Sequence, residues 1–391
     1  MLRSLDSGIS GLQAHQTMLD VTANNIANVN TTGFKSSSTQ FEDTLSEMLK
    51  SAGGASAEVG STNPAQVGLG VKVAAISTNF TQGSTDSTGN PTDMMISGDG
   101  FFTVKSGGQT MYTRAGSFTF DSNGQLAAPD GSLVQGWAAA GGVVPSANSP
   151  LSTITLPSNS VAPAIATTTA KLAGNLPSDA AVGTAVTETE GVYDSTGASR
   201  NLNLTFTKTA TGWDVAGSDG TGATGTATMT FANGALTSGT SITVGGVTVD
   251  MSGTTGFAGL QTATISGQDG RASGTLQSYS LSSDGQLVGS YSNGATETIA
   301  QIALANFTNP DGLAKVGSTD FTPTIASGAA TVGVAGTNGL GTLIGGSLEM
   351  SNVDLTQEFS NLIVAQRGFE ANARIITTSD QILQDLNQMQ H

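Results

Sequence analysis

The chain has 391 residues and is acidic, with 29 Asp and Glu against 13 Lys and Arg, a formal net charge of −16. The basic residues are scattered singly, which argues against a nucleic-acid partner, because phosphate binding needs clustered Lys and Arg. Cysteine is absent, which excludes disulfides, thiolate metal sites and cysteine nucleophiles. Only 11% of residues are charged and 52 are glycine, a composition that favours short strands and turns over a helical enzyme.

The sequence predicts neither a membrane insertion nor a cleaved secretory signal. A membrane-spanning helix needs about 20 consecutive apolar residues, and no such run is present. Near the start of the chain, Asp6, Ser7 and Gly8 interrupt any apolar core of a signal peptide. We therefore expect the protein either to stay inside the cell or to leave it by a route that needs no cleaved signal.

Residues 5–28 predict an amphipathic helix whose apolar positions alternate in steps of four and three, a heptad pattern. The predicted seam of this helix comprises Leu5, Ile9, Leu12, Gln16, Leu19, Ala23 and Ile26. Its end carries Asn24, Asn25, Asn28 and Asn30, although asparagine is a poor helix former. We expect these asparagines to cap the helix and turn the chain, with hydrogen bonds to another helix as the alternative.

Residues 355–389 predict a longer helix with the same rhythm. Its predicted seam comprises Leu355, Phe359, Leu362, Gln366, Phe369, Ala373, Ile376, Asp380 and Leu383. Asp354 is the predicted N-cap, and Gln357 is its predicted capping-box partner.

Neither helix is expected to be stable alone, because Gly8, Gly11 and Gly368 each cost about 1 kcal/mol relative to alanine inside a helix. A narrow apolar seam also needs a partner surface. Two alternatives remain at this point. Either the two seams pair within one molecule, or they also pack on neighbouring copies and order fully only on assembly.

The segment that follows the first helix predicts a connector over residues 31–75. Phe41, Leu45, Met48 and Leu49 in "FEDTLSEML" predict a short amphipathic helix. Residues 51–70 have the Gly- and Ser-rich composition of a flexible linker.

The middle of the chain predicts β-sheet, because apolar and polar residues alternate between Gly-Gly, Asn-Gly and Asp-Gly turns. The predicted buried face includes Phe101, Thr103, Met111, Tyr112, Phe118, Phe120 and Leu126. "FTFDSNGQLAAPDG" (118–131) is echoed by "YSLSSDGQLVGSYSNG" (279–294), which predicts similar hairpins on either side of an insertion. We therefore expect a first β-domain over residues 76–146 and 281–350, with a second β-domain inserted over residues 147–280.

Catalytic and metal-binding patterns are weak. The two histidines are His15 and the final residue, His391, so a Ser-His-Asp triad or a zinc site has almost no material. "DSNGQLAAPDG" has Leu126 where a calcium loop needs glycine, and "GLGTLIGG" (339–346) has Ile344 at the third glycine of a dinucleotide fingerprint. We predict no enzyme activity, no cofactor and no metal.

Several long motifs resemble the flagellar rod and hook proteins, the family that builds the axial structure of bacterial flagella. The motifs are "ANNIANVNTTGFKSS" (23–37), "ISGDGFFTV" (96–104), "YTRAGSFTFDSNGQL" (112–126), "IALANFTNPDGL" (302–313) and "SNVDLTQEFSNLIVAQRGFEANARII" (351–376). The first of them supplies the signature residues Asn24, Asn25, Asn28, Asn30, Thr32, Gly33 and Phe34. The total length and the insertion are similar to those of the hook subunit, whereas rod subunits are shorter and generally lack a large insertion.

The resemblance implies a mixed, mainly β, discontinuous chain. In this fold, residues 1–30 and 351–391 form a coiled-coil-like helical core, and the second β-domain is inserted in the first. It also implies self-assembly into a hollow, curved tube that carries motor torque as a universal joint, with both seams acting in assembly. The resemblance further implies that Asn25 and Asn28 make polar contacts, within or between subunits, that fix register.

The resemblance also implies a location and a set of partners. Family members leave the cell through the flagellar type III export apparatus with an uncleaved signal, and Phe41 to Leu45 resembles the motif that engages the export gate. The implied location is the extracellular hook, and the implied partners are the hook cap, the distal rod and the hook–filament junction proteins. The alternatives are a rod subunit with an unusual insertion, expected to form straight tubes, and an unrelated β-rich surface adhesin or surface enzyme.

Overall fold

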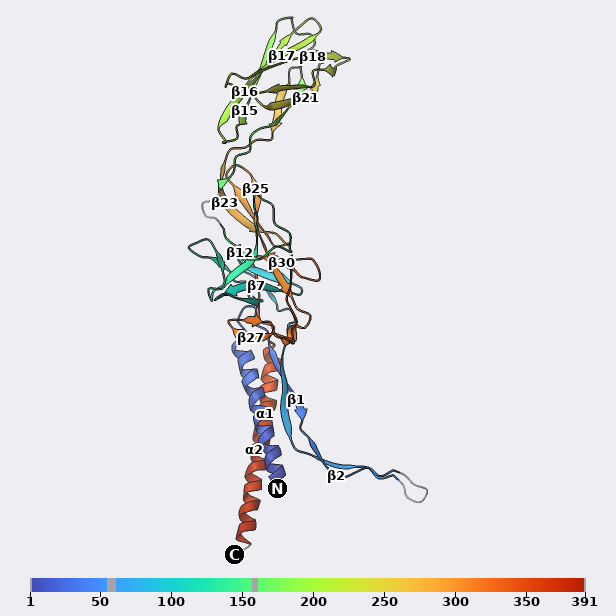
Figure 1. Cartoon of the computed structure of the whole chain (residues 1–391), viewed down its shortest axis with the longest axis vertical. Coiled ribbons are helices and arrows are strands. Elements are labelled where there is room, and N and C mark those ends of the chain that lie inside the picture. The colour runs from blue at the N-terminus through green and yellow to red at the C-terminus, as the bar shows by residue number, and fades with distance from the viewer. Residues whose placement is uncertain (1, 55–60, 157–160, 390–391) are drawn as a thin grey trace. The chain divides into compact units, whose positions relative to one another are not determined.

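A computed structural model describes residues 2–54, 61–156 and 161–389 of the chain. The fold is mainly β, with one long helix near each end of the sequence (Figure 1). These helices are α1 (Leu2–Ala27) and α2 (Leu355–Gln388), so both predicted helices are confirmed.

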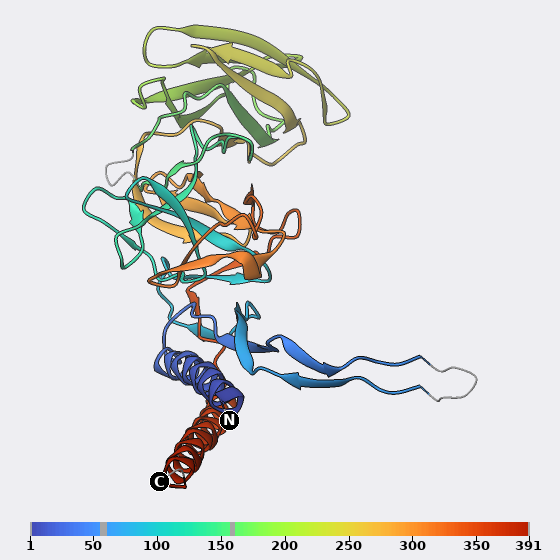
Figure 2. The same cartoon turned by 60° about the horizontal axis from the view of Figure 1, so that its bottom comes forward.

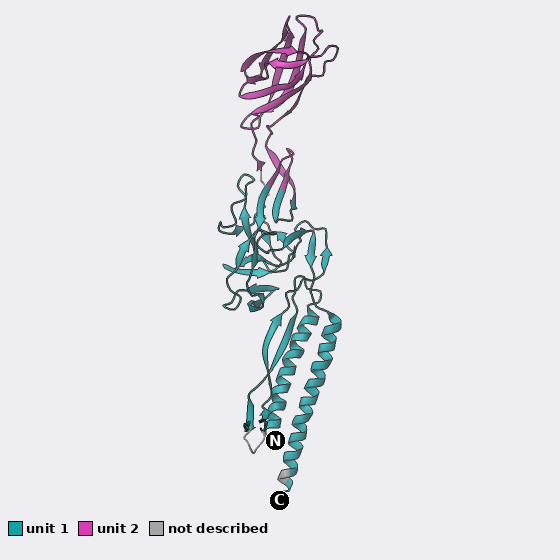
Figure 3. Cartoon of the chain, turned by 90° about the vertical axis from the view of Figure 1, so that its right-hand side faces the viewer, with its two compact units in different colours: residues 1–156, 280–288, 298–391 teal, residues 157–279, 289–297 magenta. Residues whose placement is uncertain are grey.

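The chain divides into two compact units, coloured separately in Figure 3. Unit 1 is built from Met1–Leu156, Ser280–Val288 and Thr298–His391, and unit 2 from Pro157–Tyr279 and Gly289–Glu297. Both terminal helices share unit 1 with the strands between them, whereas the sequence predicted a separate helical domain. Hydrogen bonds between residues 33–37, 79–83 and 349–352 join the two parts.

The start of α2 has a carboxylate cap. The Asp354 side chain accepts hydrogen bonds from the backbone N–H groups of Thr356, at 2.8 Å, and Gln357, at 3.3 Å, which confirms the predicted N-cap. The predicted capping box is wrong, because the Gln357 amide donates forward to Asn361 Oδ1 at 3.1 Å. A partner one turn along the helix therefore holds this side chain away from the cap.

Residues 37–50 form strands, so the predicted short helix in this segment is wrong. β1 (Ser37–Asp43) pairs with β4 (Val71–Thr78), and β2 (Ser46–Lys50) pairs with β3 (Ala65–Gly68), both antiparallel. Figures 1 and 2 show the two pairs as one two-stranded ribbon. The β-branched residues of β4 supply a pairing partner that a local helix pattern does not reveal. Residues 55–60 of the predicted flexible stretch lie outside the described residues.

The remaining strands of unit 1 surround an aromatic core. In chain order they are β5 (Thr85–Ser87), β6 (Met94–Ser97), β7 (Phe101–Ser106), β8 (Gln109–Thr113), β9 (Thr119–Phe120), β10 (Leu126–Ala127), β11 (Leu133–Ala138), β12 (Ser152–Thr153), β26 (Leu304–Asn306), β27 (Ala314–Gly317), β28 (Asp320–Thr322), β29 (Thr331–Gly333), β30 (Thr342–Gly345) and β31 (Ser347–Glu349), with a 3-10 turn at Pro310–Gly312. Residues of β23 (Gly274–Leu281), β24 (Gln286–Tyr291) and β25 (Thr296–Ile302) are divided between the two units.

The central strand order in this unit is β25-β11-β7-β8-β28-β27. Six of the seven predicted core residues are buried, and only Phe120 is half-exposed. Phe101 lies at the centre, with its ring centroid 5.4–5.9 Å from those of Phe80, Phe307 and Phe321. Such tilted and edge-on ring pairs add to the stabilisation from burial.

The echoed sequence phrases form matching turns, as predicted. In the first, the Asp121 N–H donates to the Gln125 carbonyl at 2.9 Å, and the Gly124 N–H donates to the Asp121 carbonyl at 3.0 Å. In the second, Ser282 N–H donates to the Gln286 carbonyl, and Gly285 N–H donates to the Ser282 carbonyl, at the same two distances. The glycine has a positive φ in both turns, which explains why these phrases share it.

Unit 2 is a nine-stranded sheet around its own apolar core. Its strands are β13 (Val161–Ala162), β14 (Thr169–Asn175), β15 (Ala185–Tyr193), β16 (Ser199–Lys208), β17 (Gly212–Ser218), β18 (Thr224–Ala232), β19 (Ala235–Ser238), β20 (Ser241–Val244), β21 (Val247–Thr255) and β22 (Thr264–Gln268), of which all but β13 belong to that sheet. Trp213, Phe206 and Met229 lie in the core. The opposite face of β15 to β18 is dominated by threonines and other small residues.

Candidate assembly surface and buried junction

The two terminal helices run side by side in opposite directions (Figures 1 and 3). In this contact, glycines of one helix face larger side chains of the other. A Cβ atom added at Gly11 would lie 2.7 Å from Asn372 Nδ2, and one added at Gly368 would lie 2.5 Å from His15 Cε1. At Gly8, an added Cβ would lie 3.3 Å from Ile376. The glycines therefore make room for side chains of the facing helix, and this packing offsets their poor helix propensity.

Most large apolar side chains of the helices do not occupy the buried positions of this contact. In α1 the buried positions are Gly8, Gly11, Ala14, Thr22 and Asn25. Most members of the predicted seam come one residue later, about 100° further round the helix. The described chain thus buries a face of small residues and leaves the predicted seams at its flank.

The structure places the predicted seam residues as follows. Half-buried are Leu5, Leu12, Leu19, Ile26, Leu362, Ala373 and Ile376, and exposed are Ile9, Gln16, Ala23, Leu355, Phe359, Gln366, Phe369, Asp380 and Leu383. Phe359 is 51% exposed, and Val364, which the seam did not include, is 59% exposed. Ile363, Ile375 and Ile382 add to this exposed apolar surface on α2. Exposed apolar patches mark interaction sites in soluble proteins, and α2 carries several such side chains.

Asn25 connects the end of α1 to both neighbouring segments. Its side chain is buried, and its Nδ2 donates to the Ser37 carbonyl at 2.7 Å and to Glu358 Oε1 at 3.0 Å. Its Oδ1 accepts from the Ser37 backbone N–H at 3.0 Å. One amide therefore joins α1, β1 and α2. These bonds need a donor nitrogen and an acceptor oxygen on one short side chain, which asparagine supplies.

The other signature residues shape the turn that follows α1. Asn28 Nδ2 donates to the Asn24 carbonyl and to Asn24 Oδ1 at 2.9 and 2.8 Å, and its Oδ1 accepts from Thr31 at 3.0 Å. Asn30 is exposed and Thr32 is half-buried.

Gly33 and Phe34 complete this turn. Gly33 has a φ of 69° and donates to the Glu349 carbonyl at 2.7 Å. A Cβ added at Gly33 would lie 2.7 Å from Ala115 Cα, so glycine is required by both conformation and space. The Phe34 ring lies 5.1 Å from the Lys315 ammonium.

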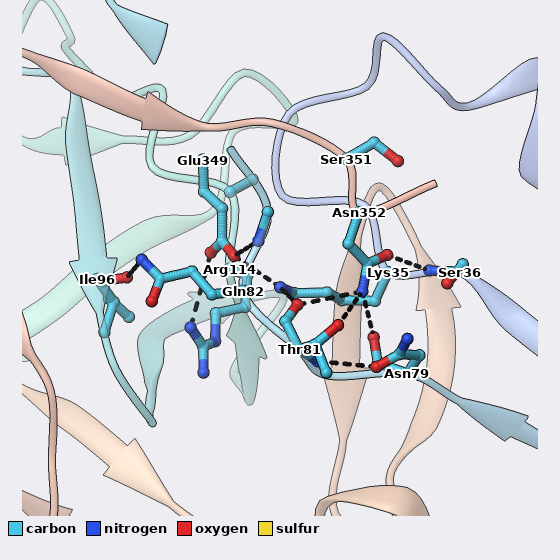
Figure 4. A network of polar contacts seen from close by, with 12 residues as sticks. Lys35, Ser36, Asn79, Thr81, Gln82, Ile96, Arg114, Glu349, Ser351 and Asn352 are labelled. Atoms are coloured by element: carbon cyan, nitrogen blue, oxygen red, sulfur yellow. Dashed lines mark hydrogen bonds and ion pairs between the residues drawn. The ribbon is translucent and has the colours of Figure 1, made fainter. Parts of the chain in front are cut away.

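A buried group of charges, the junction cluster of Lys35, Arg114 and Glu349, joins three segments (Figure 4). Lys35 Nζ lies 2.6 Å from Glu349 Oε1, and both side chains are fully buried. Arg114 Nη1 lies 3.6 Å from Glu349 Oε2 and donates to the Gly98 carbonyl at 2.9 Å. A single carboxylate thus compensates two buried cations, which makes it the most costly member to remove.

Backbone groups complete the coordination of the junction cluster. The Lys35 ammonium also donates to the Thr81 carbonyl at 2.7 Å, and the Gly83 N–H donates to Glu349 Oε1 at 2.9 Å. Burial lowers the pKa of Lys35, and the Glu349 carboxylate partly offsets this effect. Burial also lowers the pKa of Arg114.

Asn352 closes the same junction one turn before α2 (Figure 4). Its Oδ1 accepts from the Ser36 N–H at 2.9 Å, and its Nδ2 donates to the Asn79 carbonyl at 2.8 Å and to Thr81 at 3.1 Å. The two helices therefore enter the β-rich part of unit 1 through fixed hydrogen bonds.

A hollow of about 640 Å³, here named the signature groove, lies beside this junction. The end of α1, residues 31–35, the 128–130 turn and the β27–β28 turn line it. Ser318 and Thr319 in the last turn have φ values of 50° and 64°, a left-handed conformation that costs L-residues about 1–2 kcal/mol each. Strain retained at a cavity rim is typical of functional sites.

The wall of the signature groove carries two neighbouring carboxyl groups, Asp130 and Asp320. Burial raises the pKa of Asp320 to about 6, and the charge of Asp130 adds to the effect.

The predicted export motif lies on and just after β1. Phe41 is partly exposed, and its ring centroid is 5.8 Å from that of His15. Leu45 is 83% exposed. The structure does not bring these two residues into the junction, and their role in export stays a prediction.

Sequence reasoning did not find the junction cluster or the signature groove. Lys35 lies near the end of the quoted signature motif. Glu349 is the one acidic residue in the mainly apolar phrase "TLIGGSLEM". A single charge inside an apolar run was the available signal, since such a residue is buried only when it is paired.

A metal site and a membrane-spanning helix each place requirements on the described residues. No group of three or more His, Cys, Asp or Glu side chains in the described part of the chain is arranged to hold a metal ion. None of the helices that the structure describes is long and apolar enough to cross a membrane.

Comparison with known families agrees with the architecture. Residues 5–35 match the flagella basal body rod protein family, residues 95–169 match the flagellar hook protein FlgE/F/G D1 domain, and residues 344–389 match the C-terminal region of flagellar basal body rod FlgEFG proteins. These matches define the class as the rod and hook proteins of the flagellar axis.

Full-length relatives identify the branch of this class. The chain is 39% identical to the flagellar hook protein FlgE of Borreliella burgdorferi, with 99% of each chain covered, and 37% identical to that of Salmonella typhimurium, over 98% of this chain and 99% of the relative. It is 32% identical to the flagellar basal-body rod protein FlgG of Bacillus subtilis, over 99% of this chain and 98% of the relative. The chain belongs to the flagellar hook protein family, a structural family of the bacterial flagellum and not an enzyme family.

Proposed function

We propose that the chain is the subunit of a hollow, curved hook tube that works as a universal joint between motor and filament. In this proposal the terminal helices form a coiled-coil-like core domain that lines the tube, and the second β-domain is inserted in the first and lies outside. The subunit leaves the cell through the flagellar type III export apparatus without a cleaved signal, and Phe41 and Leu45 belong to its export motif. The hook cap, distal rod and hook–filament junction proteins are its proposed neighbours.

The exposed apolar surface of α2 carries the proposal. Phe359, Ile363 and Val364 lie at half-exposed positions of one long helix. The side chains of α2 that pack on the glycines of α1 are Asn372 and Ile376 instead. Burying one such side chain contributes about 1.5–3 kcal/mol. Helices from neighbouring copies are the partner surface that fits a repeated apolar stripe.

The test compares tube formation by purified chains in negative-stain electron micrographs. The chain carrying Phe359→Gln and Val364→Gln is expected to stay monomeric under conditions in which the unchanged chain forms curved tubes. Val182→Gln, at an exposed apolar position of unit 2, is the matched control and is expected to leave tube formation unchanged. Equal tube formation by the α2 variant would contradict the assembly role, and straight tubes from the unchanged chain would favour a rod subunit.

A further inference from the structure

The hairpin arm, formed by β2 and β3, buries none of its strand residues in the described structure, although Glu47 makes an exposed ion pair with Arg3. All nine residues of the two strands are exposed, and Leu45, Met48 and Leu49 are 83%, 57% and 59% exposed. An isolated two-stranded hairpin is marginally stable in water. A hairpin with this much exposed apolar surface fits a role as a segment that docks elsewhere.

The signature groove has the complementary chemistry. Phe34, Pro129 and Phe321 supply apolar lining, and the carboxyl groups of Asp130 and Asp320 lie together in its wall. In the described structure neither carboxyl group makes an ion pair. An occupant with apolar side chains next to one cation would satisfy both features.

Few cations of this chain are available for that role. Five exposed basic residues of unit 1 make no ion pair within the described residues, namely Lys50, Lys105, Lys315, Arg367 and Arg374. Lys315 already lines the groove, but its ammonium donates to the Lys35 carbonyl at 3.0 Å and to Ser37 Oγ at 2.8 Å. Lys105 is preceded by Val104, which is buried and therefore cannot cover the apolar lining of the groove. The two arginines lie on α2 beside the surface already assigned to helix packing. Lys50 directly follows Met48 and Leu49 in an extended strand, and it is the remaining match.

We propose that the signature groove receives residues Met48–Lys50 of the hairpin arm from a second copy of this chain. Met48 and Leu49 cover the apolar lining, and the Lys50 ammonium faces Asp130 and Asp320. The strained Ser318–Thr319 turn forms the rim of the groove against which the arm lies. This contact rests on the proposed tube and would link each copy to the next outside the helical core.

Cysteine cross-linking tests the contact directly, because the chain has no cysteine of its own. Chains with Met48→Cys and chains with Ala128→Cys, a lining residue of the groove, are mixed, polymerised and oxidised. Mass spectrometry of the digest is expected to find the disulfide between the two variants in the polymer and not in the unpolymerised mixture. Replacing Ala128→Cys by Ile325→Cys, fully exposed and outside the groove, is the matched control and is expected to give none.

A double-mutant cycle tests the charges. Lys50→Met and Asp130→Asn are each expected to raise the critical concentration for polymerisation up to about fivefold, and the double variant no further than Lys50→Met alone. Asp130→Asn retains the Oδ1 atom that accepts from Ser132, so the turn is kept. Lys105→Met is the matched control and is expected to have no effect.

Distinct outcomes separate this contact from the proposed function. Tubes without the Met48–Ala128 disulfide, or with additive effects in the cycle, would overturn the docking of the arm and leave the hook subunit intact. A disulfide from Ala128→Cys to a copy carrying Arg374→Cys would assign the groove to α2 and overturn it equally. Failure of the unchanged chain to form any tube would instead overturn the proposed function.

Discussion

Replacing Glu349 by glutamine should destabilise unit 1 more than any other single change in the junction cluster. Glu349 is fully buried and compensates the cations of Lys35 and Arg114. Glutamine keeps the shape and one acceptor oxygen, but it leaves two buried cations without a counter-charge. Removing one partner of a buried ion pair costs about 3–5 kcal/mol, so we expect Glu349→Gln to cost at least about 3 kcal/mol.

The structure also predicts the order of costs within the junction cluster. Lys35→Met removes one cation and leaves Glu349 paired with Arg114, with the Gly83 N–H still donating to it. The loss is then that of a charged hydrogen bond, about 1.5–3 kcal/mol. Glu42→Gln makes the same chemical change at an exposed ion pair with Lys72 and should cost less than about 1 kcal/mol.

Tryptophan fluorescence during urea unfolding of the monomer measures these costs. Trp137 is buried in unit 1 and Trp213 is buried in unit 2, so a Trp213→Phe background reports unit 1 alone. A cost below about 1 kcal/mol for Glu349→Gln would refute the reasoning. So would an equal cost for Lys35→Met, because it would mean that charge balance does not govern the junction.

Three further changes test other parts of unit 1. The raised pKa of Asp320 makes the folded state bind more protons than the unfolded state between about pH 4 and pH 6, so the free energy of unfolding falls as the pH rises through this range. Asp320→Asn should remove this fall. After discounting for solvent in the open groove, the fall should be about 1–2 kcal/mol in urea titrations. Gly33→Ala should cost at least about 2 kcal/mol in the same unfolding assay, through its positive φ and contact with Ala115, and a neutral result would contradict this. Asn25→Ala should cost about 1–3 kcal/mol, because Glu358 and the backbone of β1 lose their buried partner; unchanged hydrogen exchange at the end of α1 would count against it.

The periodic parts of the fold were accessible from the sequence. Long heptad patterns predicted both helices, and the N-cap at Asp354 followed from residue type and position alone. Turn phrases around Gly124 and Gly285 predicted matching hairpins, because an Asn-Gly or Asp-Gly pair selects a local conformation without help from distant residues. In each case the deciding interaction lies within a few residues of the pattern.

The failures have the opposite character. Residues 41–49 were predicted as a short amphipathic helix because β4, the partner that makes β1 a strand, lies about 30 residues away. The junction cluster joins Lys35 to Glu349 across 314 positions, and no local pattern links them. The seam prediction identified apolar positions, but the contact between α1 and α2 depends on Gly11 and Gly368, whose effect is to permit close approach. Helix periodicity ranks residues by hydrophobicity and therefore misses a face selected for small size.

In this arrangement, the contacts that stabilise the fold of one chain differ from the apolar surface that is available for contacts with other copies. Within a single chain, glycines and buried hydrogen bonds such as that of Asn25 to Glu358 hold the helices together. Several large apolar residues of α2, including Phe359 and Val364, remain exposed. Their burial can therefore stabilise contacts with other copies without being needed for the fold of one subunit. In the proposed tube, a subunit built in this way could keep its internal geometry while its contacts with other copies change, and bending requires this property of each subunit.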